Sequence, residues 1–375
     1  MHTKGGEQFS LVNHIAIDFR MAHHTGIGRY IRGIVGALAN TPSKLQYTLI
    51  QNRNNQADIP FEFSSQNTKI PIYSLSEQIL FPQIARFADC FHAPHYNAPV
   101  FWKKKLVVTI HDLIHLRFAN HLASPFARAY AQVLLPIVVR RADAIIAVSE
   151  HTKKDLVEML RVNPKKIIVI HHGIDPDFLK PAKIQVSQAT KNEPYFLCVG
   201  LIKAHKNIGI LLEAFRNLKR TGAFPNIRLK FVGTPDLKQK VVRKWFQIIK
   251  QESDISLECH LDDQQLKQTY QNATALIFPS FYEGFGFPLL EAMGSEIPIV
   301  AARSSSIPEV IGEKAGLLFN PFSTSELQGC MRRILEEKDL SGQLVQEGAK
   351  RLQLFRWDVA AQKTKAVYES VLGKN

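Results

Sequence analysis

The sequence predicts an α/β protein with two doubly wound, Rossmann-like domains that face each other across a cleft. Short apolar runs alternate with amphipathic helical patterns, as in parallel sheets that helices cover on both faces. The alternation lapses in a polar, proline-containing stretch at residues 175–194 and then begins again. The 375 residues are enough for two domains, each with its own core.

The first half is expected to form one parallel sheet. Its strands are predicted where apolar and β-branched residues run together, at residues 14–19, 47–50, 90–92, 106–111, 144–149 and 167–171. Helices are predicted between them at residues 27–38, 126–141 and 152–160. Ligands of such sheets bind at the carboxyl ends of the strands, so the residues that follow each strand are the candidates for function.

The second half repeats the pattern. Its strands are predicted at residues 195–199, 229–232, 255–259, 275–278, 299–301 and 316–319. Its helices are predicted at residues 208–218, 239–251 and 327–337, followed by an amphipathic helical tail at residues 340–372. The expected domains are residues 1–182 and residues 183–357, and residues 358–375 are expected to form a last helix.

An excess of basic side chains predicts attraction to an anionic partner. There are 47 Lys and Arg against 33 Asp and Glu, a net charge of +14. No nucleic-acid-binding motif appears, so we expect no nucleic-acid partner. The anionic inner face of the cytoplasmic membrane is the other candidate, because basic clusters stand at residues 103–105, 140–141, 153–154 and 165–166. A solvated basic surface without a partner explains the charge equally well.

The cysteines predict a reduced, cytoplasmic protein. Cys90, Cys198 and Cys259 stand in apolar strand patterns, and Cys330 is isolated, which fits neither a disulfide framework nor a zinc site. The first residues have no signal-peptide core, and the longest apolar run, at residues 133–139, is too short to cross a bilayer.

The most informative stretch runs from Pro279 to Met293, Pro-Ser-Phe-Tyr-Glu-Gly-Phe-Gly-Phe-Pro-Leu-Leu-Glu-Ala-Met, and joins a predicted buried strand to a helix. Its two glycines let the backbone approach a ligand closely. Pro288 suits the first helical position, and the next two amides are then expected to be free to bind a diphosphate. The carboxylates of Glu283 and Glu291 are suited to accept hydrogen bonds from sugar hydroxyls. The stretch therefore predicts a nucleotide-sugar site.

The order Glu-Gly-Phe-Gly-x-Pro-x-x-Glu-Ala-Met resembles the donor-site signature of the family-four glycosyltransferases, retaining enzymes of the GT-B fold. The resemblance covers nearly the whole chain and is closest to the bacterial mannosyltransferase branch. It implies that Glu283, Lys206 and His111 are catalytic and that the last helix crosses back onto the first domain. The donor contacts expected here are Gly28, Lys203, His205, Lys206, Gly284, Phe285, Gly286, Phe287, Leu289, Leu290 and Glu291.

The loop after the first strand of the second domain, Gly-Leu-Ile-Lys-Ala-His-Lys-Asn at residues 200–207, carries the basic part of this site. Lys206 matches the lysine of the family and is expected to stabilise the diphosphate as it leaves. The family's arginine is absent, because its position is occupied by His205 or Leu201. Lys203 is the candidate substitute.

The segment Gly-Ile-Gly-Arg-Tyr at residues 26–30 follows the first strand and opens the first helix. It is not a dinucleotide fingerprint, because Ile31 stands where the third glycine is needed. The resemblance implies an acceptor-side position for Gly26, Arg29 and Tyr30. A tight turn before a helix is the alternative interpretation.

Two further polar residues follow strands of the first domain. His111 ends a predicted strand, and the resemblance implies that it contacts the donor sugar. Asp112 is assigned to the acceptor side, and it is expected to orient that imidazole or to cap the next segment. His95, within a His-Ala-Pro-His motif, is assigned to the acceptor side, together with variable loops at residues 52–68 and 116–125.

No metal site is expected. The neighbours His171-His172 point to opposite faces of a strand, so they do not form a ligand pair. Asp175-Pro-Asp177 lies in the linker and is typical of a turn. Asp262-Asp263 is predicted to cap a helix and to favour its first turn by charge.

The resemblance therefore implies a retaining transfer of mannose from GDP-mannose to a glycan or polyprenyl-linked acceptor, in cell-surface polysaccharide or lipopolysaccharide synthesis, and we expect this transfer to be metal-independent. UDP-sugars are the alternative donors. Same-face attack with the departing phosphate as base is expected, and inversion with His111 as base stays open. Two other classes stay open as well: a nucleotide-sugar epimerase of the UDP-GlcNAc 2-epimerase kind, and a catalytically silent nucleotide-binding partner of a glycan assembly complex.

Overall fold

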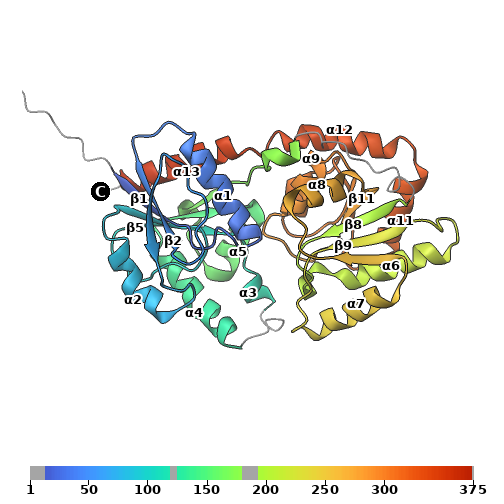
Figure 1. The fold of residues 1–375 in the computed structure, drawn as a ribbon, viewed down its shortest axis with the longest axis horizontal. Coiled ribbons are helices and arrows are strands. Elements are labelled where there is room, and N and C mark those ends of the chain that lie inside the picture. The colour runs from blue at the N-terminus through green and yellow to red at the C-terminus, as the bar shows by residue number, and fades with distance from the viewer. Residues whose placement is uncertain (1–12, 119–124, 180–192, 374–375) are drawn as a thin grey trace, which may run out of the picture.

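The computed structural model describes residues 13–118, 125–179 and 193–373, which form two lobes side by side (Figure 1). The first lobe holds a seven-stranded, wholly parallel sheet in the order β3-β2-β1-β4-β5-β6-β7. Its strands are β1 (His14–Asp18), β2 (Gln46–Asn52), β3 (Ser64–Thr68), β4 (Cys90–Ala93), β5 (Lys105–Ile110), β6 (Ala144–Ala147) and β7 (Ile167–Val169). Its helices are α1 (Gly26–Ala39), α2 (Leu75–Ile84), α3 (Ile114–Arg117), α4 (Pro125–Arg141) and α5 (Glu150–Leu160).

Both faces of this sheet are buried. Successive strand residues point to opposite faces, so Ile15 and Ile17 of β1 join the core under α1, whereas Ala16 joins the core on the other face with residues of α2, α4 and α5. Leu106 and Val107 of β5 divide between the two cores in the same way. The continuous apolar runs of the sequence are explained by this double burial.

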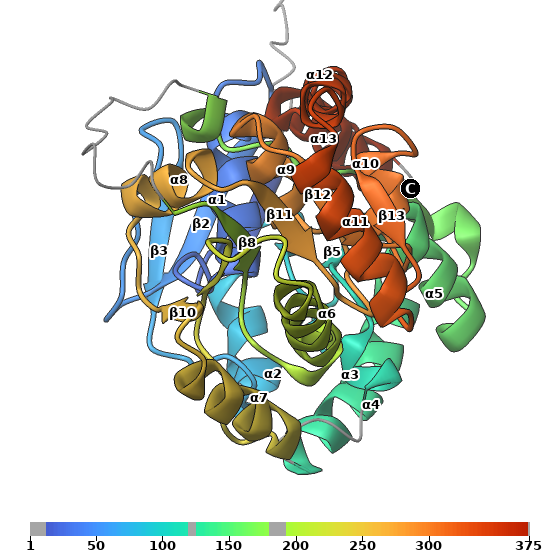
Figure 2. The same cartoon turned by 90° about the vertical axis from the view of Figure 1, so that its right-hand side faces the viewer.

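The second lobe holds a six-stranded parallel sheet in the order β10-β9-β8-β11-β12-β13. Its strands are β8 (Tyr195–Val199), β9 (Arg228–Val232), β10 (Ile255–Glu258), β11 (Ala275–Phe278), β12 (Ile299–Ala302) and β13 (Leu317–Phe319). Its helices are α6 (Ile208–Arg220), α7 (Lys240–Gln251), α8 (Asp263–Gln271), α9 (Phe287–Gly294), α10 (Ile307–Ile311) and α11 (Thr324–Glu336). Figure 2 shows α8 and α9 on one side of the sheet and α6 and α7 on the other. The expected pair of doubly wound domains is confirmed.

The tail forms α12 (Leu340–Leu352) and α13 (Trp357–Leu372), and it crosses from the second lobe back to the first (Figure 1). Helix α13 packs on α1, β5 and β6. The hydroxyl of Tyr368 lies 2.6 Å from Nδ1 of the buried His92 in β4, and the indole of Trp357 lies so close to Gly33 that a Cβ there would overlap it. The predicted return of the last helix is therefore confirmed.

Two sequence expectations are wrong, and two others fall outside the described residues. The proposed acceptor loop at 52–68 contains β3, a polar edge strand, Ser-Ser-Gln-Asn-Thr, that has no apolar signature to announce it. Cys259 is exposed and does not lie in a core. Most of the loop at 116–125 lies in the segment 119–124, which is outside the described residues. The domain boundary at residues 182 and 183 lies wholly in the segment 180–192, which is also outside them.

Candidate nucleotide-sugar site

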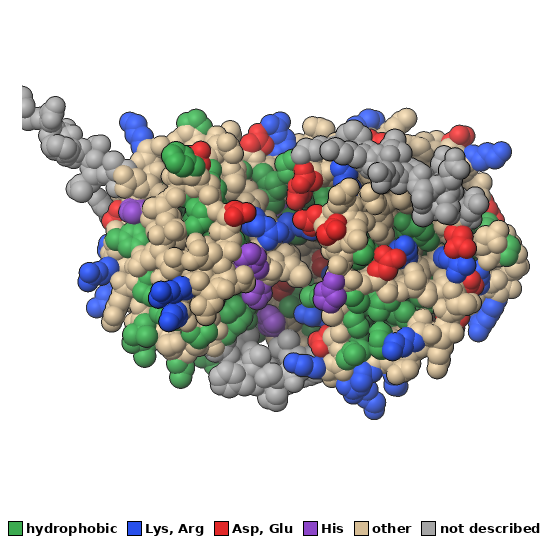
Figure 3. All heavy atoms as spheres, in the orientation of Figure 1, with side chains coloured by type: hydrophobic (Ala, Val, Ile, Leu, Met, Phe, Trp, Pro, Cys, Tyr) green, Lys and Arg blue, Asp and Glu red, His purple; other side chains and the backbone are tan. Residues whose placement is uncertain are grey.

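The carboxyl ends of the two sheets face each other. His111 follows β5 of the first domain, and the loop 279–286 follows β11 of the second. The two backbones touch: a Cβ on Gly284 would overlap the carbonyl oxygen of His111, so the contact admits only glycine. Histidine side chains gather in the hollow between the lobes, beside Lys and Arg side chains (Figure 3).

The helix that follows this loop, α9, begins one residue earlier than predicted. Gly286 has φ of +109° and forms the N-cap, so Phe287 is the first helical residue and Pro288 the second. The amide of Leu289 donates to the carbonyl of Gly286 at 3.0 Å, which corrects the expectation that it is free. The side chains of Leu289 and Leu290 are buried in the core of the second domain, so only their backbone can face a ligand.

Lys206 and Glu283 are in direct contact at the mouth of this loop. Nζ of Lys206, in the turn after β8, lies 2.6 Å from Oε1 of Glu283, and these side chains are 17% and 13% exposed. Gly200, with φ of +127°, leaves room for the lysine chain, whose Nζ would lie 3.8 Å from a Cβ at that position. The structure thus brings together two of the three residues to which the resemblance gave a catalytic role.

The second carboxylate of the signature is occupied by protein groups. Glu291 is buried in α9, forms an ion pair with Arg29 of α1, and accepts a 2.6 Å hydrogen bond from the Tyr270 hydroxyl. Arg29, which the sequence placed on the acceptor side, therefore reaches α9 across the domain boundary. Its guanidinium carbon also lies 5.8 Å from the ring centroid of Phe287.

The imidazole of His111 is held in one orientation. Its Nε2 lies 2.9 Å from the carbonyl of Pro94, which can only accept, so Nε2 carries the proton. Burial lowers the pKa of His111 below its ordinary value, against smaller opposing effects from that hydrogen bond and from Asp112. The ring is therefore neutral near pH 7, and its Nδ1 is left as a hydrogen-bond acceptor.

The acceptor-side candidates have different positions. Tyr30 is buried beneath His111, with ring centroids 4.9 Å apart, and its hydroxyl lies 2.8 Å from that of Thr109, so it lies behind the cleft wall.

His95 is also buried, and its Nδ1 lies 3.4 Å from the hydroxyl of Tyr73. Oδ1 of Asp112 accepts from the amide of Ile114, the first residue of α3, at 2.9 Å, whereas the N-cap of that helix is Leu113. A Cβ on Gly28 would overlap the backbone of Ala22, whereas Gly26 has open space.

The remaining basic-loop candidates do not form the pair made by Lys206. Lys203 forms the N-cap of the short turn Ala204–Lys206 and is half-buried. His205 contributes its carbonyl, which accepts from the amide of Phe281 at 2.8 Å. Its ring lies 6.2 Å from that of Phe118 in the first domain.

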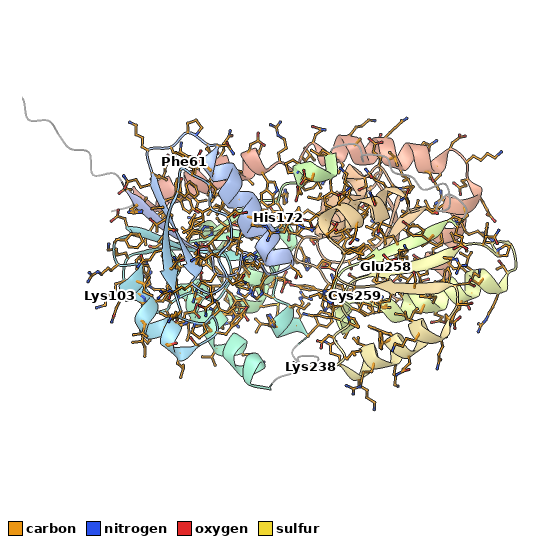
Figure 4. The ribbon with its side chains drawn as sticks, in the orientation of Figure 1. Phe61, Lys103, His172, Lys238, Glu258 and Cys259 are labelled. Atoms are coloured by element: carbon orange, nitrogen blue, oxygen red, sulfur yellow. The ribbon has the colours of Figure 1, made fainter. Side chains whose placement is uncertain are left out.

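The two adjacent histidines behave as expected of core and hinge residues. His172 is buried where the chain passes between the lobes (Figure 4), and its ring stacks on Phe287 with centroids 4.8 Å apart and planes at 5°. Burial lowers its pKa well below the ordinary value.

The carboxylate of Asp175 accepts from the amide of Asp177, which confirms the turn interpretation. Among the described residues, no group of three or more His, Cys, Asp or Glu side chains is arranged to ligate a metal.

Two family models match this chain. One, described as Glycosyltransferase Family 4, matches residues 26–178, and the other, described as Glycosyl transferases group 1, matches residues 180–351. The chain is a family-four glycosyltransferase.

Curated relatives of this glycosyltransferase include two mannosyltransferases. It is 23% identical to O-antigen chain mannosyltransferase B of Escherichia coli, over 92% of this chain and 96% of that protein. It is 29% identical to O-antigen chain mannosyltransferase RfbU of Salmonella typhimurium, over 64% of this chain and 67% of that protein.

Solved structures confirm the GT-B fold of the glycosyltransferase. Sucrose-phosphate synthase from Thermosynechococcus elongatus matches with a TM-score of 0.79 at 20% identity, over 97% of this chain and 100% of that one. Anabaena HepE, solved in complex with UDP and glucose, matches with a TM-score of 0.73 at 18% identity, over 95% and 99% of the two chains. At such low identity the likeness establishes the fold alone.

The glycosyltransferase also uses residues to which the sequence gave no role. Ser305, strained at φ of +46°, accepts from the amide of Glu283 at 2.8 Å. Ser306 donates to the carbonyls of Glu283 and Phe285 at 3.0 and 3.1 Å. These serines fix the loop that carries the first carboxylate of the signature. The three consecutive serines before an Ile-Pro-Glu motif were the available signal.

A third carboxylate of the glycosyltransferase joins the two domains. Glu309 of α10 accepts from the backbone amides of Glu150 and His151, at the start of α5, and from Nε2 of His171 at 2.7 Å. Burial alone would raise the pKa of Glu309, but these donors outweigh it and lower the pKa below its ordinary value.

Across the described residues of the glycosyltransferase, we find no helix with both the length and the apolarity that a bilayer span requires.

Proposed function

We propose that the protein transfers mannose from GDP-mannose, with retention of configuration, to a glycan or polyprenyl-linked acceptor in cell-surface polysaccharide or lipopolysaccharide synthesis. The observation that carries the proposal is the 2.6 Å contact of Lys206 with Glu283 at the head of α9, opposite His111 of the other domain. The full-length similarity to an O-antigen chain mannosyltransferase supports mannose as the sugar.

The diphosphate would lie at the start of α9. The helix dipole and the first amides of a helix favour an anion there, and Lys206 would add a positive charge to it. Glu283 would then be released from its lysine and accept hydrogen bonds from hydroxyls of the sugar. Glu291 would bind the ribose hydroxyls, for which Arg29 must leave the carboxylate. The freed guanidinium is suited to bind a phosphate in a bidentate manner.

The role of His111 follows from its tautomer. Because Nε2 donates to a backbone carbonyl, the neutral ring presents Nδ1 as an acceptor for a hydroxyl of the transferred sugar. A neutral imidazole adds no positive charge beside the forming oxocarbenium ion. Its low pKa, caused chiefly by burial, therefore suits a sugar-binding role.

The bond changes balance without an added cofactor. The bond between the anomeric carbon and the phosphate oxygen breaks, the acceptor oxygen bonds to that carbon on the same face, and the acceptor proton passes to the leaving phosphate. Negative charge grows on the diphosphate during this step, and losing one preorganised donor to such charge costs about 3 kcal/mol. We propose that Lys206 and the helix amides supply this stabilisation and that no divalent metal is required.

Binding experiments test the donor. Thermal-shift and calorimetric titrations with GDP, UDP, ADP and their sugars should show the tightest binding for GDP and GDP-mannose. A preference for UDP would support the second candidate, a UDP-sugar donor such as the UDP-glucose with which Anabaena HepE, a protein of the same fold, was also solved. Failure to bind any nucleoside diphosphate would overturn the proposal.

Product analysis separates the other classes. Incubation with the donor alone should release GDP and free mannose slowly, whereas an epimerase would convert the sugar, and a silent binding partner would leave the donor intact. Glu283→Ala should keep the affinity for GDP and lose turnover, because the carboxylate is assigned to the sugar.

We further propose that the first domain binds the anionic inner membrane surface. Leu75 and Ile79 of α2 and the neighbouring Phe101 are 78%, 62% and 64% exposed. Lys103 and Lys104 follow them, and Figure 4 shows Lys103 on the side away from the second domain. Sedimentation with phosphatidylglycerol vesicles, but not with phosphatidylcholine vesicles, should carry the protein down, and charge reversal of the two lysines should abolish this. Equal sedimentation of that variant would refute the membrane role.

A further inference from the structure

The residue just before the first carboxylate of the signature is buried in the opposite domain. Tyr282 belongs to the loop of the second domain, yet its side chain is only 3% exposed. Its hydroxyl donates to Oδ2 of Asp155 at 2.6 Å and accepts from the amide of Leu113 at 3.0 Å, and both partners belong to the first domain. The ring also contacts the first domain, with centroids 5.9 Å from Phe118 and 5.6 Å from His151.

Asp155 is a prepared partner for this hydroxyl. Its carboxylate, on α5, is fully buried, and Arg117 donates to both of its oxygens, at 2.6 and 3.3 Å. The guanidinium carbon of Arg117 also lies 5.5 Å from the centroid of the Tyr282 ring. Burial, helped by Asp112 and Asp155, raises the pKa of Tyr282, so the phenol stays protonated and donates.

This contact sets the distance between the two sides of the site. Gly284, two residues after Tyr282, touches the backbone of His111, and the Thr152 hydroxyl lies 3.1 Å from the carbonyl of His111 and 3.4 Å from that of Gly284. Glu283 directly follows Tyr282 in the chain, and His111 is two residues before Leu113, whose amide donates to Tyr282. Tyr282 therefore fixes the backbone close to both catalytic candidates.

We infer that Tyr282 and Asp155 form an interdomain positioning pair, which places Glu283 against His111 when the domains close. The inference rests on the proposed function, in which these two residues contact the transferred sugar. Tyr282 is a positioning residue, because it acts through its neighbour and touches neither sugar nor phosphate. Closure of this kind also excludes water from the activated sugar.

A packing role can be separated from a positioning role. Tyr282→Phe keeps the ring and its contacts and removes only the hydroxyl with its two hydrogen bonds. The matched control is Tyr195→Phe, because the Tyr195 hydroxyl donates to the carbonyl of Thr269 at 2.7 Å within the second domain. Each variant loses a hydrogen bond that a phenol donates, but only Tyr282→Phe loses it across the domain boundary, together with the hydrogen bond from the amide of Leu113.

The first test compares GDP-mannose hydrolysis and GDP binding in the full-length protein. Tyr282→Phe should lower kcat about tenfold or more and change the Kd for GDP less than about twofold, because the nucleotide is held by the second domain. Asp155→Asn should add little to the loss in the Tyr282→Phe background, because both changes remove one contact. Tyr195→Phe should leave kcat unchanged. Equal kcat in the two phenylalanine variants, or additive losses with Asp155→Asn, would overturn the inference.

The second test does not depend on the donor. Small-angle scattering of the protein without nucleotide should show a larger radius of gyration for Tyr282→Phe than for wild type and for Tyr195→Phe. An unchanged radius would refute the positioning pair. If wild-type protein hydrolyses no nucleotide sugar, the proposed function fails, and the scattering comparison still decides whether Tyr282 holds the domains together.

Discussion

Replacing Lys206 by methionine should remove both a stabilising ion pair and the main positive charge of the site. Its Nζ lies 2.6 Å from Oε1 of Glu283, and neither side chain is more than 17% exposed. Removing one partner of a fully buried pair costs about 3–5 kcal/mol, and partial exposure reduces this to roughly 2 kcal/mol here. Methionine keeps the apolar stem, so the loss reflects the charge and not the packing.

Turnover should fall further than stability. In the variant the unpaired carboxylate of Glu283 faces the diphosphate, and the leaving group loses a cation that the transition state needs. Losing one such electrostatic contact costs about 3–4 kcal/mol, so kcat should fall between roughly 100-fold and 1,000-fold. The assay is release of GDP from GDP-mannose, together with urea denaturation.

Two companion variants make the result decisive. Lys206→Met with Glu283→Gln should regain the lost stability, because no unpaired charge remains, yet stay inactive. Lys250→Met is the control, because that lysine is exposed on α7 and packs over Phe246 with Nζ 4.6 Å from the ring centroid. If Lys206→Met keeps kcat within about threefold of wild type, the assigned role of this lysine is wrong.

Three further predictions concern the junction of the domains and the core of the first domain. Glu309→Gln should lower kcat and enlarge the scattering radius, because an amide cannot accept from all three donors. In wild type the stability that this carboxylate supplies is present above pH 4.5, the ordinary glutamate pKa, and should be lost as pH falls through the lowered value, so denaturation curves below pH 4.5 should show a shallower pH dependence for Glu309→Gln, and equal slopes would contradict this. Burial, reinforced by His111, lowers the pKa of His92 from 6.5 to about 3 in the folded protein. Between these two pH values the unfolded protein therefore binds a proton at His92 that the folded protein does not bind. Stability should therefore drop by about 1.4 kcal/mol per pH unit from this group below pH 6.5, and denaturation curves of His92→Gln should show a shallower dependence. Gly284→Ala should open the cleft and abolish turnover, because its Cβ would overlap the backbone of His111, whereas Gly342→Ala, with open space around it, should be tolerated; equal activity of the two would count against the close approach.

The fold was largely predictable because its signals are local. Buried parallel strands require continuous apolar runs, and the helices between them require a 3.6-residue period, as in α1, where Tyr30, Ile31, Ile34, Val35 and Leu38 are the buried positions after Gly28. The helix cap at Asp262 was also predictable, because a cap depends on residues that are neighbours in the chain. Its carboxylate accepts from the amide of Gln265 in a capping box. Strand β3 was missed because a polar edge strand lacks that periodicity.

The site was predictable only in part. The signature and the loop of Lys206 predicted that Glu283 and Lys206 lie together, because strand–loop–helix junctions are local features that the sequence displays. The sequence could not indicate that Arg29 pairs with Glu291, because those residues are distant in the chain and belong to different domains. It also assigned a free amide to Leu289, whereas the positive φ of Gly286 folds the chain so that this amide is bonded.

By itself, then, the sequence determined two parallel sheets and the loop and helix α9 that carry Glu283 and Glu291, because apolar periodicity, glycine placement and charge are properties of neighbouring residues. Only the tertiary structure decided which groups meet between the domains, such as Tyr282 with Asp155 and Tyr368 with His92. The physical reason is that hydrogen bonds and ion pairs act over a few ångströms. Which distant residues come within that range depends on how the two lobes pack together.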